Sequence, residues 1–168
     1  MKDSFIMNEY KEALVEKSNV EFYVDSMENF GYEITQKKDE AGKVKLYFKR
    51  AFVEENREEL KNLETKFDKN FCEYETTLAN KNLGATTLAL SIGIVAVAFL
   101  TGATFAYLAG KFVTCAIGGL LGFMGCGVTY PLYKKVNGKN VGKAYAKANK
   151  LKQEQYDVLK KAYSLVNA

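Results

Sequence analysis

The 168-residue sequence has no histidine and no tryptophan, one proline and three cysteines. The absence of histidine excludes Ser-His-Asp triads and histidine-ligated metal sites. Three cysteines argue against a disulfide framework. Phosphate-binding loops of the form GxxxxGK(S/T), CxxC pairs, GxSxG elbows and HExxH motifs are also missing from the sequence. We therefore expect no catalytic activity and no metal or other cofactor.

Charged residues are nearly missing from the middle of the chain. Residues 82–133 carry one charge, Lys111, although charged residues make up 26% of the sequence. The uncharged runs on either side of this lysine each exceed the roughly 20 residues that cross ~30 Å of hydrocarbon. Two such runs joined by a Gly110-Lys111 step indicate a helical hairpin in a membrane rather than two soluble core helices. We predict transmembrane helices at residues 83–110 and 111–133.

The two predicted spans differ in apolar content. Between Leu88 and Ala109 the first has ten Leu, Ile, Val and Phe residues, whereas the second span has eight such residues and five glycines. The second span should be marginal alone and should insert with help from the first. It is the better candidate for a mobile element.

Lysines near the ends of the spans predict their orientation. The group that precedes and follows the hairpin comprises Lys66, Lys69, Lys81, Lys134, Lys135, Lys139, Lys143, Lys147 and Lys150. Lys111 is alone in the turn, so the positive-inside rule places both termini in the cytoplasm of a multi-pass cell-membrane protein. The first 20 residues contain no continuous apolar run of a signal peptide, so the hairpin itself is expected to direct insertion.

Small residues recur at steps of 3 and 4 along both spans. The second span contributes Cys115, Gly118, Gly122, Gly125 and Thr129, and the first span contributes Ala89, Gly93 and Ala96. Small side chains allow two helices to approach closely. One interpretation is packing of the two spans against each other. The alternative is that part of this small-residue surface, including Gly119 and Cys126, contacts other copies of the chain. Such contacts would build an oligomer or a pore.

The polar residues of the two spans indicate whether the protein could transport ions or protons. Neither span contains Asp, Glu, Arg or Lys, the residue types that usually mark ion or proton pathways. A dedicated transporter is therefore not expected. A weakly selective pore lined by Ser91, Thr101, Thr104 and Thr114 stays open as an alternative.

Residues 1–52 are predicted to form a small cytoplasmic α+β unit of two helices and a β-hairpin. The first helix is predicted from Phe5, Ile6, Tyr10, Leu14 and Val15, and the second runs from Val20 to Phe30 and ends at Gly31. The β-hairpin is predicted from apolar alternation on both sides of residues 39–42. Two strands are marginally stable alone, so their apolar face needs a partner, which suggests an interaction module.

Residues 53–82 and 134–168 are predicted to be amphipathic cytoplasmic helices. The first opens with an acidic turn, Glu54, Glu55, Glu58 and Glu59, which complements a helix N-terminus better than it indicates catalysis. Asn137-Gly138 is expected to separate the second helix from the membrane span. Residues 54–80 carry a net charge of −4 and residues 143–166 a net charge of +4.

These opposite charges predict an antiparallel helical stalk of coiled-coil type, stabilised mainly by its apolar faces. The alternative places the lysines at 134, 135, 139, 143 and 147 against anionic lipid headgroups. Nucleic-acid binding is not expected, because no groove-reading motif accompanies the lysines.

The layout also resembles a known family. Asn82-Leu83-Gly84 opens the first span, the outer turn is very short, and the C-terminal helix carries Tyr145, Ala148, Tyr156 and Leu159. Over residues 54–166 this is similar to the two-span SLATT effector domains of bacterial conflict systems, although no proline follows Gly84 closely. The resemblance implies a membrane-perforating effector. The ratio of 22 Lys to 2 Arg also suggests a bacterial source.

The sequence thus predicts a mainly α membrane protein, in which a transmembrane hairpin is extended by a cytoplasmic stalk and carries the N-terminal α+β unit. The leading hypothesis is a membrane-anchored interaction, scaffold or regulatory subunit without catalytic activity. Its expected partners are the lipid bilayer and either further copies of the chain or an unidentified cytoplasmic protein. The alternative is an oligomeric, SLATT-like pore gated by the cytoplasmic part.

Overall fold

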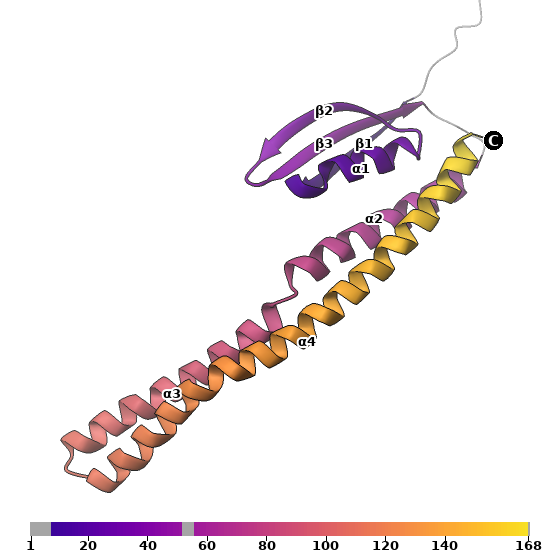
Figure 1. The fold of residues 1–168 in the computed structure, drawn as a ribbon. Coiled ribbons are helices and arrows are strands. Elements are labelled where there is room, and N and C mark those ends of the chain that lie inside the picture. Colours follow the sequence, from indigo (N-terminus) through magenta and orange to yellow (C-terminus); the bar gives the residue numbers. More distant parts are fainter. Residues whose placement is uncertain (1–7, 52–55, 168) are drawn as a thin grey trace, which may run out of the picture. The chain divides into compact units, whose positions relative to one another are not determined.

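A computed structural model of the chain describes residues 8–51 and 56–167 (Figure 1). The structure is 74% helical, with one three-stranded sheet and two long apolar helices. Its elements are β1 (Asn8–Glu16), η1 (Lys17–Asn19), α1 (Val20–Glu28), β2 (Glu33–Glu40), β3 (Lys43–Ala51), α2 (Arg57–Ala79), α3 (Leu83–Leu108) and α4 (Phe112–Val166). The predictions of a mainly helical chain and of two long apolar helices are confirmed.

The chain divides into two compact units. Met1–Cys72 together with Leu151–Ala168 forms the first, here called the sheet unit, and Glu73–Lys150 forms the second, here called the hairpin unit. Both α2 and α4 contribute residues to each unit.

The first described element of the sheet unit is a strand. The helix predicted around Tyr10, Leu14 and Val15 is wrong, because β1 occupies these positions. Phe5 and Ile6, predicted for the same helix, lie outside the described residues. β1 pairs antiparallel with β3 along its whole length. The unit predicted as helix, helix and β-hairpin is therefore a three-stranded sheet with one α-helix and a short 3-10 helix.

The predicted β-hairpin is confirmed as β2 and β3. These strands pair antiparallel on either side of Ala41-Gly42, with a shift of register between Ile34 and Gln36. Gly42 has a φ of +91°, a backbone conformation that a Cβ atom disfavours. The strand order is β1-β3-β2, so β3 is central and the other two strands form the edges.

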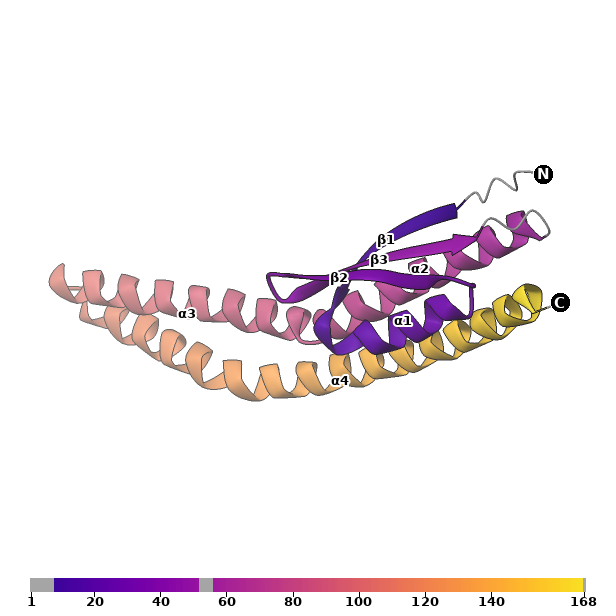
Figure 2. The same ribbon diagram turned by 90° about the horizontal axis from the view of Figure 1, so that it is seen from above.

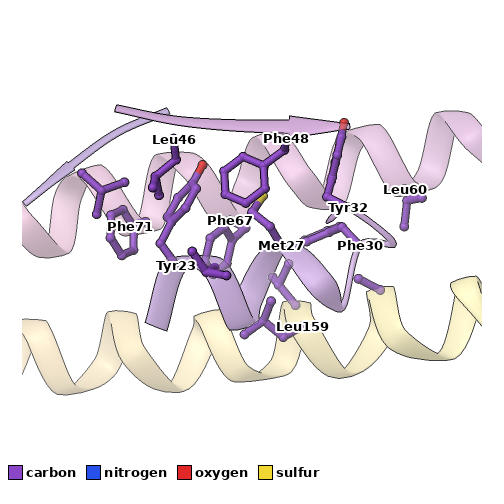
Figure 3. Close-up of a cluster of buried hydrophobic side chains, with 14 of the residues drawn as sticks. Tyr23, Met27, Phe30, Tyr32, Leu46, Phe48, Leu60, Phe67, Phe71 and Leu159 are labelled. Atoms are coloured by element: carbon purple, nitrogen blue, oxygen red, sulfur yellow. The ribbon is translucent and has the colours of Figure 1, made fainter. Parts of the chain in front are cut away.

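Alternate residues of β3 form the inner face of the sheet. Leu46 is fully buried and Phe48 is 1% exposed, and Figure 3 shows both pointing towards the helices. The ring of Phe67 lies 5.8 Å from that of Phe30 and 5.9 Å from that of Tyr23, measured between centroids. The remaining helical members of this core are Val24, Met27, Leu60, Phe71, Val158, Leu159 and Ala162. The sheet therefore packs its apolar face on α1, on α2 and on the end of α4.

Gly31 ends α1 as predicted. Its φ is +79°, its amide donates to Glu28, and the next amide, of Tyr32, donates to Met27. This pair of hydrogen bonds is the Schellman arrangement, which satisfies carbonyls that the helix end leaves without partners. The chain can therefore turn directly from α1 into β2.

The helices of the hairpin unit follow the predicted boundaries except at Asn137-Gly138. A turn at residues 80–82 separates α2 from α3. In contrast, α4 is one continuous helix of 55 residues. The predicted break at Asn137-Gly138 is wrong, and Pro131 lies inside α4 without ending it. A glycine and an asparagine weaken a helix by at most about 1 kcal/mol each, which the packing of neighbouring turns can offset.

The turn between α3 and α4 is as tight as the sequence predicts. Gly110 has a φ of +72°, its amide donates to Tyr107, and the amide of Lys111 donates to Ala106. The chain thus leaves α3 by the same Schellman arrangement and starts α4 at Phe112. The rings of Tyr107 and Phe112 meet edge to face at 5.8 Å across the turn. Within the hairpin unit, α3 and the first part of α4 lie side by side (Figures 1 and 2).

Candidate functional site

Two helices of the structure are long and apolar enough to cross a membrane. α3 has 26 residues, or about 39 Å of helix, and α4 begins with an apolar segment of similar character. A soluble core helix of this composition would be mostly buried. Here 11% and 6% of the residues in the most apolar windows are buried. The hairpin therefore presents its apolar surface outward, which is consistent with association with a membrane.

Large apolar side chains cover the outward faces of both helices. Those that are exposed on α3 include Leu83, Leu88, Leu90, Ile94, Val95, Val97, Phe99, Phe105 and Leu108. Those that are exposed on the apolar segment of α4 are Phe112, Val113, Ile117, Leu120, Leu121, Phe123, Met124 and Val128. Large apolar side chains exposed in this number along two neighbouring helices are typical of surfaces that contact a membrane or another protein.

Small residues lie where the two helices meet. A Cβ atom on Gly118 would lie 3.3 Å from the Cβ atom of Ala103, and one on Gly125 would lie 2.9 Å from the Cβ atom of Ala96. A Cβ atom on Gly122 would lie 2.6 Å from the side chain of Leu100. These three glycines let α4 approach α3 within the same hairpin.

The other predicted small residues are distributed along the same helices. Ala89, Gly93, Cys115 and Thr129 are half-buried, and Ala96 is 2% exposed. A Cβ atom on Gly93 or Gly119 would have no neighbour within 4 Å, and Cys126 is exposed. The stripe therefore divides into glycines that contact the partner helix and glycines that face outward.

Hydroxyl groups on the hairpin donate to their own helix. Ser91 donates to the Thr87 carbonyl at 2.9 Å, Thr101 to the Val97 carbonyl at 2.9 Å, and Thr104 to the Leu100 carbonyl at 3.0 Å. Their protons are thereby committed to the backbone, a common arrangement for hydroxyls on apolar helices. Thr114, the fourth residue predicted for a pore lining, is exposed.

Lysines gather at the end of the hairpin unit opposite the tight turn. Lys134, Lys135, Lys139, Lys143 and Lys147 are all exposed on α4. Lys147 forms an ion pair with Glu73 at 2.6 Å, and the Nζ of Lys81 lies 3.3 Å from the Tyr145 hydroxyl. The other four lysines form no ion pair with the described residues.

An ionic cluster in the sheet unit is absent from the sequence-based predictions. Lys11, whose side chain is 11% exposed, reaches from β1 to Glu64 at 2.7 Å and to Asp68 at 2.5 Å on α2. Arg50, 6% exposed, donates to the Phe30 carbonyl at 3.0 Å and pairs with Glu9. The sequence signal was weak, because charged residues at alternate positions of a strand usually indicate its solvent face.

The surroundings of the ionic cluster shift the pKa of one carboxyl group and of two tyrosine hydroxyls. The Arg50 guanidinium, which donates to Glu9, holds the pKa of that carboxyl below its ordinary value. Burial raises the pKa of the Tyr23 hydroxyl, and the nearby charge of Asp68 adds to the rise. Burial also raises the pKa of the Tyr32 hydroxyl. Both hydroxyls stay protonated, so Tyr23 donates to Asp68 at 2.8 Å. The arrangement is a satisfied structural contact between sheet and helix.

Within residues 8–51 and 56–167, no three His, Cys, Asp or Glu side chains are grouped closely enough to hold a metal ion. Of the acidic turn considered above, Glu58 and Glu59 are exposed at the start of α2, whereas Glu54 and Glu55 lie outside the described residues. Of the three cysteines, Cys72 and Cys126 are exposed and Cys115 is half-buried.

Comparison of the chain with models of protein families, with curated proteins and with solved structures gives no match.

Proposed function

We propose that this chain is an integral membrane protein that anchors an interaction module at the membrane surface and has no catalytic activity of its own. The observation that carries this proposal is the outward-facing apolar surface of α3 and of the first part of α4. Burying such a surface in lipid removes it from water at roughly 25 cal/mol per Å², whereas leaving it in water would favour aggregation.

The proposed orientation has both termini in the cytoplasm. Lys81 and six lysines between positions 134 and 150 lie at one end of the hairpin, and Lys111 lies at the other end. Lysines close to a span favour the cytoplasmic side. The sheet unit would then lie in the cytoplasm.

The interaction role rests on the outer surface of the sheet unit. Its inner face is filled by the helical core, but Tyr10 is 75% exposed and Leu14 is 51% exposed on the outer face of β1. β1 is also an edge strand of the sheet. Exposed aromatic and aliphatic side chains on an edge strand are typical of surfaces that bind another protein.

Cysteine labelling can test insertion and orientation together. Two single-cysteine variants are needed, one that keeps the exposed Cys72 and one that carries Lys111→Cys, each with the other native cysteines changed to serine. A membrane-impermeant maleimide should label position 111 in intact cells and Cys72 only after permeabilisation. The protein should also stay with the membrane in alkaline carbonate. Release by carbonate, or labelling of both positions from one side, would overturn the proposal.

A second hypothesis is an oligomeric pore gated by the sheet unit. It is favoured by the outward-facing Gly119, which leaves room for another helix, and by the resemblance to SLATT domains. Gly119→Leu would block such an approach without entering the contact between α3 and α4. A defined higher oligomer in lipid nanodiscs, with dye leakage from liposomes that Gly119→Leu abolishes, would support the pore. A monomer or dimer without leakage would count against it.

A further inference from the structure

The basic end of the hairpin unit has an unusual charge distribution. Six lysines and no acidic residue lie between positions 134 and 150 of α4. The apolar segment of α4 directly precedes them, so the change from uncharged to basic occurs within one helix and without a linker. Such a segment has a fixed distance from the apolar span, unlike a flexible basic tail.

The first three of these lysines, Lys134, Lys135 and Lys139, directly follow the apolar segment of α4. Tyr130, which is 72% exposed, and Tyr133 precede them, and tyrosines of this kind mark the interface of a membrane. From Lys134 to Lys139 the helix rises about 7.5 Å. The headgroup layer on one side of a bilayer is of similar thickness, roughly 5 to 8 Å. If the span ends near Tyr133, Lys134 and Lys135 lie within this layer, and Lys139, about 9 Å beyond Tyr133, lies at its outer edge, within reach of its long side chain.

Among the described residues, the lysines at this end of the hairpin unit differ in their polar partners. Lys147 has Glu73 as a partner, and Lys81 has the hydroxyl of Tyr145. The exposed Lys134, Lys135 and Lys139 form no ion pair with the described residues. The positive charge of these three lysines is therefore not paired with an acidic side chain within residues 8–51 and 56–167.

We propose that Lys134, Lys135 and Lys139 bind the phosphate groups of anionic phospholipids in the adjacent leaflet. The proposal rests on the proposed membrane insertion and adds a lipid class as the partner of this end of the hairpin. A lipid is favoured over an acidic protein or a nucleic acid, because the ammonium groups follow the apolar span directly and phosphates are the nearest anions there. The site recognises charge and depth, and it holds the hairpin at a fixed height in the bilayer.

The experiment uses the full-length chain with a single reporter. Because the sequence has no tryptophan, Tyr130→Trp introduces a single tryptophan, one helical turn before Lys134, which can be excited selectively over the tyrosines. The protein is reconstituted into vesicles of phosphatidylcholine that contain either brominated phosphatidylglycerol or brominated phosphatidylcholine at equal mole fraction. Bromine quenches the tryptophan on contact, so the ratio of the two quenching efficiencies gives the relative affinity for the anionic lipid.

Matched variants separate the site from general charge. Removing Lys134, Lys135 and Lys139 as a triple change to glutamine should lower the relative affinity, by up to about fivefold per lysine. The corresponding triple change to arginine should keep it. A control triple change to glutamine at the exposed Lys152, Lys160 and Lys161 removes the same charge farther along α4 and should have little effect. Circular dichroism of each variant checks that the helices are intact.

The outcomes are distinguishable. The site is supported if brominated phosphatidylglycerol quenches the tryptophan preferentially and if this preference falls in the glutamine triple variant. The preference should also weaken in 1 M salt, where the Debye length is about 3 Å. Equal quenching by both lipids, or a preference unchanged by the triple variant, overturns it and redirects the lysines to a protein or nucleic acid. Inorganic phosphate at matched ionic strength should not displace the lipid. If neither brominated lipid quenches the introduced tryptophan, membrane insertion is refuted instead.

Discussion

The contact between Gly125 and Ala96 makes the most direct prediction. A Cβ atom on Gly125 would lie 2.9 Å from the Cβ atom of Ala96, whereas carbon atoms pack at about 3.5 to 4.0 Å. Neither Cβ atom can rotate away, because both are attached directly to the backbone. Gly125→Ala therefore forces the two helices apart by roughly 0.6 to 1.1 Å at this level.

The size of the effect follows from two opposing terms. Overpacking of a well-packed contact costs about 1 to 3 kcal/mol. Replacing a helical glycine by alanine stabilises the helix by about 0.5 to 1 kcal/mol. The net expectation is a loss of about 0.5 to 2 kcal/mol, equivalent to a roughly 2- to 30-fold larger equilibrium constant for opening of the hairpin.

Cys115 provides a native probe for this opening. It is half-buried on α4, and the other two cysteines can be changed to serine. Alkylation of Cys115 by N-ethylmaleimide in mixed micelles, measured over a titration with sodium dodecyl sulfate, reports the population of open hairpin. Gly125→Ala should be alkylated about 2- to 30-fold faster at a given fraction of the denaturing detergent.

Two further variants decide whether the contact itself is responsible. Gly127→Ala on the same helix, where a Cβ atom would meet nothing within 4 Å, should leave the alkylation rate unchanged or lower it. Ala96→Gly removes the opposing Cβ atom, so combining it with Gly125→Ala should cost less than the sum of the two single changes. Strict additivity in this double-mutant cycle, or equal effects of Gly125→Ala and Gly127→Ala, would refute the proposed packing.

Two other predictions concern the ionic cluster of the sheet unit. Lys11→Met leaves Glu64 and Asp68 without their shared cation and should destabilise the protein by about 1 to 3 kcal/mol in urea denaturation at pH 7, and an unchanged midpoint would contradict the ion pairs. The pKa of Glu9 is lowered from an ordinary value of 4.5 by its hydrogen bonds with Arg50, so its contribution to stability is complete above pH 4.5 and is lost as the pH falls through the lowered value. Thermal unfolding between pH 7 and pH 3 should therefore show a smaller loss in Glu9→Gln than in the natural protein, and parallel curves would count against this linkage.

The first strand shows why a local pattern failed. Tyr10 and Leu14 are four residues apart, as on one face of a helix, yet both are exposed on the outer face of β1. The inward positions include Glu9 and Lys11, whose charges obscure the alternation of a half-buried strand. Their burial is possible because Arg50 and the acids of α2 neutralise them. These counter-ions come from distant parts of the chain, so no local window contains the deciding information.

Helix ends and turns were more predictable. Gly31 and Gly42 have positive φ angles at the places that the sequence marks as a helix end and a strand turn. Gly110 does the same between the two apolar helices. A glycine at a sharp turn is a local requirement of the backbone, so the sequence is enough to locate it. The continuity of α4 through Asn137-Gly138 was not predictable in this way, because asparagine and glycine only weaken a helix.

The stripe of small residues shows which features follow from the sequence and which depend on the tertiary structure. By itself the sequence determined that small residues recur at helical spacing and that the surrounding surface is apolar, since both depend only on composition and period. Which glycines contact the partner helix was decided by the tertiary structure alone. The rotations of α3 and α4 about their own axes bring Ala96, Leu100 and Ala103 against Gly118, Gly122 and Gly125 and leave Gly119 outside the contact. These rotations depend on the shapes of both helices at once, and neither helix encodes them separately.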